Sequence, residues 1–274
     1  MTVEDWKFKI ANMIDTHAHL NFPQLTKIID QVVSESKAAG VTNIIIASSN
    51  LEDSKIAIEL AQEYPGFLFA SVGIHPHKTD PENKATIKEQ LRKLDLLITS
   101  NLSQVIAIGE TGLDFSPAPP DEKDRPREGQ KELFLGQINL AKKFNLSIII
   151  HAREAIDEVI NIITNISEVN FSGTFHCYAG GKKRISKILN LPNNWYFGFD
   201  GNLTYDEGLQ KIIQLIPPER LLIETDSPFL APVPHRGEVN TPAYLPLIQQ
   251  KINDILGKDL TKQIEENSRR LFCL

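Results

Sequence analysis

The stretch Leu146-Ser147-Ile148-Ile149-Ile150-His151 decides the fold class of this chain. Its three consecutive isoleucines leave no polar alternation, which is the pattern of a strand buried on both faces of a parallel sheet. The run Ile44-Ile45-Ile46 repeats this pattern earlier in the sequence. The two runs predict an α/β protein built on a parallel sheet.

Further β-rich runs lie on either side of these two and alternate with amphipathic segments. The predicted strands are Ala11–Asp15, Thr42–Ala47, Phe67–Val72, Gln104–Gly109, Leu146–Ile150, Asn170–Phe175, Trp195–Phe199 and Arg220–Glu224. Two helical stripes are formed by Leu25, Ile28, Ile29, Val32 and Val33, ending at Gly40, and by Leu133, Phe134, Ile138 and Ala141, ending at Asn145. Tyr244–Leu256 and Thr261–Arg270 are predicted to close the chain as helices.

Eight strands with helical crossovers predict a (β/α)8 TIM barrel, with its active site in the loops that follow the strands. A doubly wound open sheet is the alternative. We expect residues 1–274 to form a single barrel domain with residues 1–10 as an N-terminal extension. The stretch Ser116–Gly129, rich in proline and charge, is expected to form a mobile loop after the fourth strand.

The composition excludes several classes of protein. The chain has 274 residues, of which 41% are hydrophobic and 23% charged, which is typical of a globular domain. Its two cysteines cannot form a disulfide framework, residues 1–10 lack the order of a signal peptide, and no apolar run is long enough to cross a membrane. A net charge of −6 gives no general attraction to nucleic acid or membrane. We expect a cytoplasmic protein, or a nuclear one if the source is eukaryotic.

The positions of the histidines give the strongest indication of function. Each of the seven follows a predicted strand and none lies on a predicted helix: His17, His19, His75, His77, His151, His176 and His235. The acidic residues Glu110, Asp200 and Asp226 follow strands in the same way. In a barrel, all these positions converge on one face.

Six of these residues are candidate metal ligands: His17, His19, Glu110, His151, His176 and Asp226. Each alone fits a structural role at least as well, because a histidine can be buried in a core and an acid can cap a turn. The pair His17-Ala18-His19 can share one metal, since strand side chains repeat every two residues. Asp15 could support such a ligand by a hydrogen bond.

Six ligands are too many for one tetrahedral zinc ion and favour a two-metal centre with a bridging carboxylate. The donors suit Zn, Mn, Fe or Ni, while an imidazole-rich site is less typical of Mg. Such a centre activates water, so it supports hydrolysis of phosphate esters, amides or carboxylic esters. The residues alone do not choose among these bonds.

At this point the sequence resembles the TatD-type deoxyribonucleases. The resemblance lies in successive motifs at Asp15–Leu20, Gly73–His77, Ile108–Phe115, His151–Ala155, His176–Gly180 and Glu224–Gly237, and it runs from about Asn12 to Phe272. It implies a metal-dependent TIM barrel of the amidohydrolase type that hydrolyses DNA phosphodiester bonds, often as a 3′-to-5′ exonuclease.

The resemblance also implies a role for each matched residue. The first of two divalent ions would be held by His17, His19, Glu110 and Asp226. The second would be held by Glu110, His151 and His176, with Glu110 bridging. Glu110 and Asp226 would be catalytic, Asp226 by accepting a proton from the attacking water.

Outside the ligand set, His75 and Arg153 would contact phosphate oxygens, although Arg153 could instead form a surface ion pair with Glu154 or Asp157. His235 and Arg236 would shape the loop after the last strand. The chain departs from the family pattern at Phe115, Ala152 and Tyr178-Ala179, none of which is a predicted ligand.

Three functions stay open on the sequence. The first is a deoxyribonuclease that acts on single strands or 3′ ends as a monomer and depends weakly on salt. The second is a metallohydrolase of another bond, such as the ester of D-aminoacyl-tRNA. The third is a barrel that serves as a non-catalytic scaffold, which missing ligands would favour; none is missing.

Overall fold

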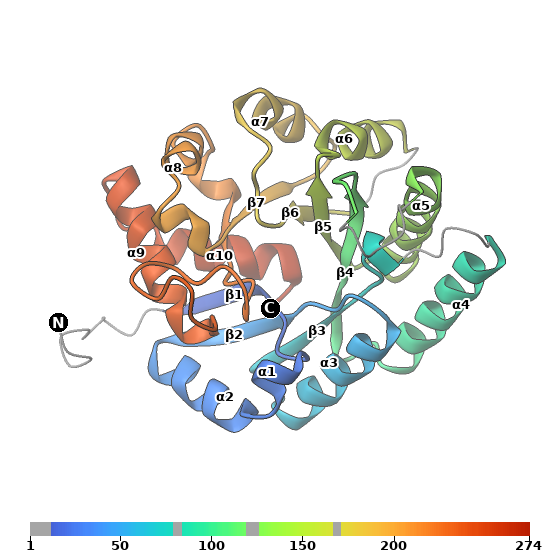
Figure 1. The fold of residues 1–274 in the computed structure, drawn as a ribbon, viewed down its shortest axis with the longest axis horizontal. Coiled ribbons are helices and arrows are strands. Elements are labelled where there is room, and N and C mark those ends of the chain that lie inside the picture. The colour runs from blue at the N-terminus through green and yellow to red at the C-terminus, as the bar shows by residue number, and fades with distance from the viewer. Residues whose placement is uncertain (1–11, 79–83, 119–125, 167–170) are drawn as a thin grey trace.

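The computed structural model describes residues 12–78, 84–118, 126–166 and 171–274, which form an eight-stranded parallel barrel surrounded by helices (Figure 1). The strands are hydrogen-bonded in chain order, which confirms the predicted (β/α)8 barrel and excludes the doubly wound sheet. They are β1 Met13–Ala18, β2 Val41–Ile46, β3 Leu68–Val72, β4 Val105–Asp114, β5 Ser147–Arg153, β6 Gly173–Phe175, β7 Trp195–Phe199 and β8 Leu221–Ile223.

The isoleucine runs pack in two directions at once. In β5, Ile149 points into the barrel, whereas Ile148 and Ile150 pack outward against the helices. All three are fully buried, and each contributes roughly 1.5–3 kcal/mol to stability by leaving water. Ile45 of β2 also faces inward. Burial on both faces is therefore the physical reason for the unbroken apolar runs.

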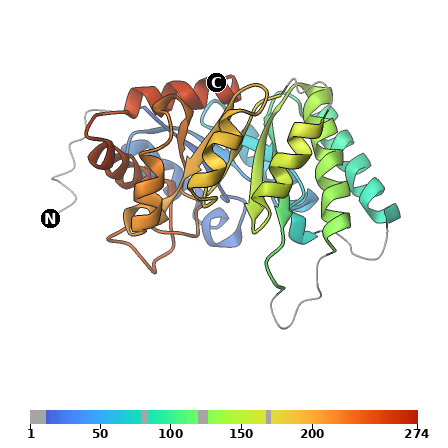
Figure 2. The same cartoon turned by 90° about the horizontal axis from the view of Figure 1, so that it is seen from above.

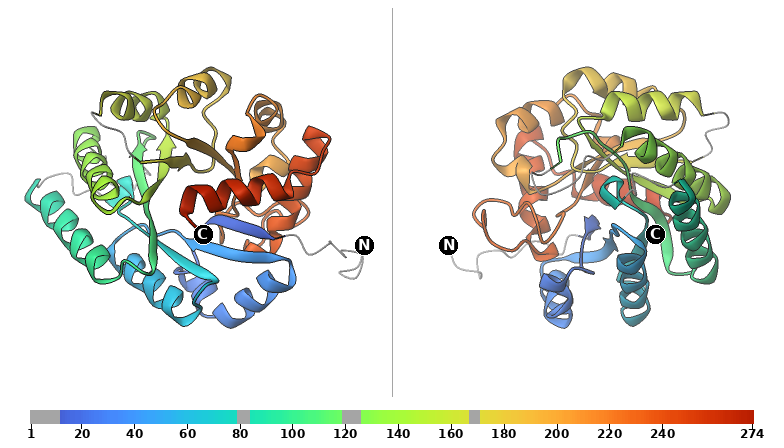
Figure 3. Two further views of the ribbon diagram at one scale, coloured as in Figure 1. Left: turned by 180° about the vertical axis from the view of Figure 1, so that it is seen from behind. Right: turned by 45° about the vertical axis from the view of Figure 1, so that its right-hand side comes forward.

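Ten α-helices cover the described part of the barrel or close its ends. They are α1 Pro23–Thr26, α2 Ile29–Ala38, α3 Leu51–Glu63, α4 Lys84–Ser100, α5 Arg127–Phe144, α6 Ile156–Asn165, α7 Lys182–Leu189, α8 Glu207–Ile213, α9 Leu245–Leu256 and α10 Thr261–Phe272. Figure 2 shows α10 along one end of the barrel, and the view from behind in Figure 3 shows it lying across that end. Leu271 and Phe272 of α10 pack against the inward-facing strand residues, so this end is filled.

Several predicted boundaries were wrong. The first stripe is broken into α1 and α2, and Ile28 between them is 46% exposed rather than packed. The α5 stripe is confirmed, and Asn145 ends that helix in a left-handed conformation at φ 53°. Arg127 to Gly129 belong to α5 rather than to a loop. Residues 119–125 of that predicted loop, and the predicted strand starts Ala11 and Asn170, lie outside the described residues.

Three strands also extend further than predicted. β1, β4 and β5 continue through polar residues, so His17, Glu110 and His151 lie within strands instead of after them. The backbone pairing of Gly112 with His151 and of Asp114 with Arg153 continues the β4–β5 ladder to this end. Ladder pairing uses only backbone groups, so the polar side chains did not end these strands.

No helix among the described residues is long and apolar enough to cross a membrane.

Candidate metal centre

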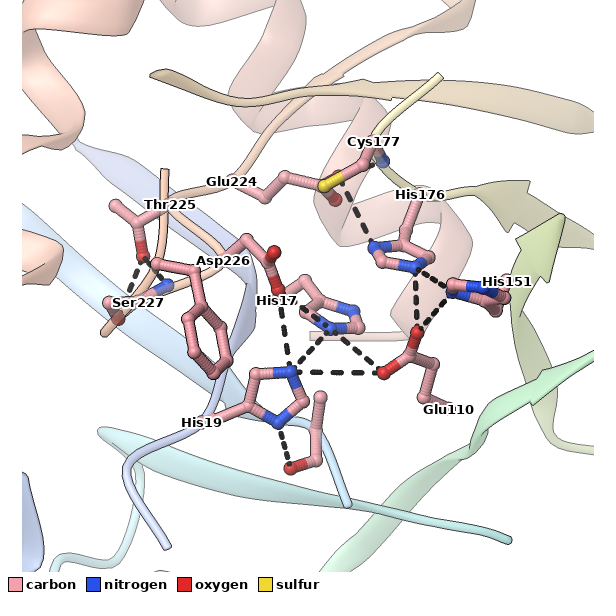
Figure 4. Close-up of polar contacts among 12 residues, drawn as sticks. His17, His19, Glu110, His151, His176, Cys177, Glu224, Thr225, Asp226 and Ser227 are labelled. Atoms are coloured by element: carbon pink, nitrogen blue, oxygen red, sulfur yellow. Dashed lines mark hydrogen bonds and ion pairs between the residues drawn. The ribbon is translucent and has the colours of Figure 1, made fainter. Parts of the chain in front are cut away.

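All six predicted ligands meet at the carboxyl ends of the strands (Figure 4). His17 lies in β1, Glu110 in β4 and His151 in β5. His19, His176 and Asp226 follow strands β1, β6 and β8. The converging strand ends of the barrel therefore bring together side chains that are far apart in sequence.

Backbone hydrogen bonds close the barrel at this point and fix the two ends of the ligand set. The N–H of Asp226 donates to the carbonyl of His17 at 2.9 Å, and the N–H of His19 donates to the carbonyl of Ser227 at 2.7 Å. The segment after β8 thus pairs with β1 beyond the strand proper. This pairing places Asp226 beside both histidines.

The first cluster consists of His17, His19 and Asp226. The Nε2 atoms of the two histidines lie 3.3 Å apart, and Oδ1 of Asp226 lies 3.4 Å from that of His17 and 3.3 Å from that of His19. Ligand atoms about 2.1 Å from a tetrahedral zinc ion lie about 3.4 Å from one another. The three separations therefore fit a single divalent ion of this size.

The second cluster consists of His151 and His176 around Glu110. Oε1 of Glu110 lies 2.8 Å from Nδ1 of His151 and 2.8 Å from Nε2 of His176. Its other oxygen, Oε2, lies 3.7 Å from Nε2 of His17 and 3.8 Å from Nε2 of His19. One carboxylate therefore faces both clusters, as a carboxylate that bridges two metal ions must do.

Neighbouring acceptors set which nitrogen of each ring faces the clusters. Nδ1 of His19 lies 3.2 Å from the carbonyl oxygen of Ala47, and Nε2 of His151 lies 3.0 Å from Oδ2 of Asp114. Each of these nitrogens carries the proton that it donates, which leaves the opposite nitrogen of the ring free to bind a cation. Metal-binding histidines are usually oriented in this way.

The pKa shifts at the two clusters show how strongly the histidines and carboxylates interact. Burial, helped by neighbouring His176, holds the pKa of His17 well below its ordinary value, so this ring is neutral. Burial opposes ionisation of Glu110, but the surrounding histidines hold its pKa well below the ordinary value. Burial likewise opposes charge on His176, yet Glu110 raises its pKa to about 9. Glu110 and His176 therefore attract each other strongly, which is the pairing of negative and positive charge expected around a buried carboxylate.

These observations agree with a binuclear metal site. The clusters contain nitrogen and carboxylate donors, their separations fit shared ions, and several donors are oriented by hydrogen bonds from behind. Buried His17 Nδ1 and His176 Nδ1 have no hydrogen-bond partner among the described atoms. Nδ1 of His176 lies 3.9 Å from Oε1 of Glu224, which is close enough for charge attraction.

Buried carboxyl groups behind the centre hold its ligands in place. Both oxygens of Asp15 bind Thr225, at 3.0 Å to its N–H and 2.6 Å to its hydroxyl, next to Asp226 in sequence. The support that the sequence suggested for a ligand is seen in a longer contact, because Oδ1 of Asp15 also accepts the backbone N–H of His17 at 3.3 Å. Burial raises the pKa of Asp15 to about 7 and that of Glu224 to about 8.

Sequence reasoning gave no role to three residues beside the clusters, Asp114, Glu224 and His77, although it listed His77 among the converging histidines. Asp114 lies four residues after Glu110 on the same face of β4, and Glu224 lies two residues before Asp226. The alternation of strand side chains could have indicated both. His77 lies on a short 3-10 turn, Pro76–Lys78, contrary to the expectation that no histidine lies on a helix, and its Nε2 is 2.7 Å from Oδ2 of Asp114.

His75 reaches the second cluster, but as a hydrogen-bond donor. Its Nδ1 accepts the backbone N–H of His77 at 3.1 Å, so the ring proton lies on Nε2, which is 3.4 Å from Oε1 of Glu110. Burial lowers the pKa of His75 to about 4, so the ring is neutral. A neutral ring whose N–H points toward the centre is better suited to donate to an anion than to bind a metal ion.

The other predicted residues lie further from the clusters. Arg153 is exposed, lines the cleft and forms no ion pair with the part of the chain that the structure describes. Asp157, its suggested ion-pair partner, instead contacts Arg184 and Lys187. His235 stacks on Tyr244 with ring centres 4.0 Å apart, within the loop after β8 and outside the clusters.

A cleft of about 1060 Å³ opens over the two clusters. His19, Glu110 and Asp226 lie in its lining, with Phe22 and Phe229 among the aromatic lining residues and Arg153 among the basic ones. Its volume lies at the upper end of the range found for small-molecule sites.

Comparisons with known proteins agree with this geometry. A family model described as TatD related DNase matches residues 14–273. The chain is 34% identical over 268 residues to the uncharacterized metal-dependent hydrolase YabD of Bacillus subtilis, with 95% of this chain and 98% of that protein covered. It is 32% identical over 274 residues to the 3′-5′ ssDNA/RNA exonuclease TatD of Pectobacterium atrosepticum, with 96% and 100% covered. The crystal structure of the TatD homolog YJJV from Escherichia coli has the same fold, with a TM-score of 0.85 at 24% identity and 97% and 99% coverage.

Proposed function

Because this chain belongs to the TatD-related DNase family of metal-dependent hydrolases, we propose that it hydrolyses phosphodiester bonds in single-stranded DNA, working from the 3′ end. The main support for this proposal is the position of Glu110, whose two oxygens face two separate ligand clusters at the floor of an open cleft. A relative with 32% identity bears the name 3′-5′ ssDNA/RNA exonuclease. The proposal extends that activity to this chain.

The residues at the floor of the cleft divide between two divalent ions. His17, His19 and Asp226 would hold the first, and His151 and His176 would hold the second, while Glu110 would donate to both. When bound, two divalent ions at such a centre lower the pKa of water and neutralise negative charge on a phosphodiester. The donor set accepts Zn, Mn, Fe or Ni, with Mg less favoured.

Asp226 is the proposed proton acceptor. The histidines beside it hold its pKa below the ordinary value against the effect of burial, so the carboxylate is ionised at neutral pH. Its side chain remains 13% exposed, on the cleft side of the cluster. As a water oxygen attacks phosphorus and the bond from phosphorus to O3′ breaks, an ionised carboxylate at this position accepts the proton that the water loses. The departing O3′ takes up a proton from solvent and leaves as a hydroxyl.

His75 and Arg153 are the proposed phosphate contacts. The Nε2–H of His75 points toward the centre, and the guanidinium of Arg153 lines the cleft without an ion-pair partner among the described residues. Both groups donate to anionic oxygen, and a guanidinium can bind two phosphate oxygens together. They would orient the phosphodiester over the two clusters.

The test is cleavage of 5′-labelled single-stranded DNA by metal-stripped protein, with Mg, Mn or Zn added back. We expect stepwise shortening from the 3′ end, restored by metal and lost in Glu110→Ala and Asp226→Asn. Asp95→Asn, at an exposed ion pair with Lys143 that does not line the cleft, is the matched control and is expected to keep full activity. Folded, metal-loaded protein that leaves DNA intact would overturn the proposal. Hydrolysis of D-aminoacyl-tRNA in the same panel would then reassign the substrate.

A further inference from the structure

Two phenylalanine rings stand at the edge of the cleft beside the first ligand cluster. The ring of Phe22 stacks on His19, with centres 4.7 Å apart and planes at 23°. Phe229 meets Phe22 edge to face at 6.0 Å and 81°, and lies 6.1 Å from His19. Both rings line the cleft, and Phe229 is 47% exposed. The rings thus form an aromatic edge immediately next to a candidate metal ligand.

The backbone holds Phe229 in a fixed place although its ring is exposed. Its N–H donates to the carbonyl of Asp226 at 2.9 Å, and its own carbonyl accepts from Nδ2 of Asn240 at 2.6 Å. Asn240 is fully buried and also donates to the carbonyl of Thr225 at 2.8 Å. Phe229 is therefore positioned by the same segment that carries Asp226. Core packing does not account for a half-exposed aromatic ring that is placed so firmly.

We propose that Phe229, backed by Phe22, stacks against the nucleobase adjacent to the scissile phosphate. This inference rests on the proposed function and adds how the single DNA strand is bound at the cleft. Every base presents a flat π-face, so aromatic stacking binds single strands without sequence preference. A chain with a net charge of −6 gains this affinity without needing many cations along the strand.

The test compares two oligodeoxynucleotides that differ only in whether the nucleotides flanking the last phosphodiester carry bases or are abasic. For Phe229→Ala we expect kcat/KM on the natural strand to fall on the order of tenfold, and on the abasic strand to stay unchanged. Phe229→Trp keeps activity on the natural strand because it keeps a stacking face. Val239→Ala, in the same loop, 56% exposed and absent from the cleft lining, is the matched control.

A binding measurement separates stacking from a structural role. An oligonucleotide with 2-aminopurine beside a non-hydrolysable last linkage should lose fluorescence on binding the metal-loaded protein, and this quenching should be absent in Phe229→Ala. Equal losses of kcat/KM on both strands, or no loss on either, would overturn the stacking role while wild-type cleavage upholds the proposed function. A wild-type protein that cleaves neither strand would overturn both proposals.

Discussion

Oδ2 of Asp114 lies 3.0 Å from Nε2 of His151 and turns the opposite nitrogen of that ring toward Glu110. Asp114 is completely buried at its side chain, and hydrogen bonds from His151 and His77 hold its pKa below the ordinary value against the effect of burial. The same carboxylate accepts from Ser116 through its other oxygen. Both oxygens of Asp114 are therefore needed as acceptors.

Asp114→Asn should weaken metal binding because an amide has one acceptor oxygen where the carboxylate has two. We expect affinity for the more weakly held ion to fall about 10- to 100-fold, the usual effect of losing a partner that orients a ligand. Competition titration with a chelating dye measures this, and Asp95→Asn serves as the control for removing a charge. Unchanged affinity in Asp114→Asn would show that His151 keeps its orientation without the carboxylate.

His75→Ala should lower catalysis while leaving the metal content intact. The Nδ1 atom of His75 accepts the N–H of His77, which makes Nε2 a donor and argues against metal ligation. Losing one hydrogen bond to a charged phosphate oxygen should lower kcat/KM about 10- to 100-fold. Metal analysis of the purified variant, beside its kinetics, decides the point. Loss of one equivalent of metal would identify His75 as a ligand instead.

Much of the fold was predictable because barrel strands are buried on both faces and therefore appear in the sequence as unbroken apolar runs. Ile149 and Ile148 are buried on opposite faces of one strand, so both faces carry apolar side chains and the sequence shows an unbroken apolar run. The convergence of His17, Glu110 and Asp226 followed from topology alone, since all parallel strands of a barrel end on the same face.

Other features could not be predicted from local pattern. β4 continues from Glu110 to Asp114 because its backbone pairs with β5, and no property of the polar side chains signals that pairing. The break at Ile28 leaves an apolar residue 46% exposed, which runs against the helical stripe. The tautomer of His75 depends on a single backbone N–H, from His77. Such facts depend on tertiary contacts that periodicity does not encode.

Glu224 should make the metal-free protein less stable as the pH rises. Burial raises its pKa to about 8 from an ordinary value of 4.5, so between these values the folded chain keeps a proton that the unfolded chain releases. The stabilising contribution of this carboxyl is complete below the lower value and is lost as the pH rises through the higher one. Glu224→Gln imitates the protonated acid and should remove this dependence.

Urea unfolding of the metal-free proteins between about pH 5 and pH 8 measures the effect. As the pH rises across this range, the free energy of unfolding of Glu224→Gln should increase by at least about 1 kcal/mol relative to that of wild type. Glu219→Gln, which removes an exposed carboxylate, is the control. A constant difference between Glu224→Gln and wild type would mean that Glu224 is ionised throughout.

Binding of single-stranded DNA should depend only weakly on salt. Lys78 and Arg153 line the cleft without ion-pair partners among the described residues, whereas Arg184 contacts Asp157. Each phosphate neutralised on a single strand contributes about −0.7 to the slope of log affinity against log salt, so two contacts predict a slope of about −1.4.

Arg153→Ala should make this slope less steep by about 0.7. Lys262→Ala is the control and should leave the slope unchanged, because the side chain of Lys262 is 88% exposed and lies on α10 at the opposite end of the barrel. Affinities for a non-hydrolysable oligonucleotide, measured at constant metal concentration and varied potassium chloride, give both slopes. A wild-type slope several times steeper would require many more phosphate contacts than the cleft offers. Binding would then have to extend over a basic surface beyond it, and stacking on Phe229 would contribute only a minor share of the affinity.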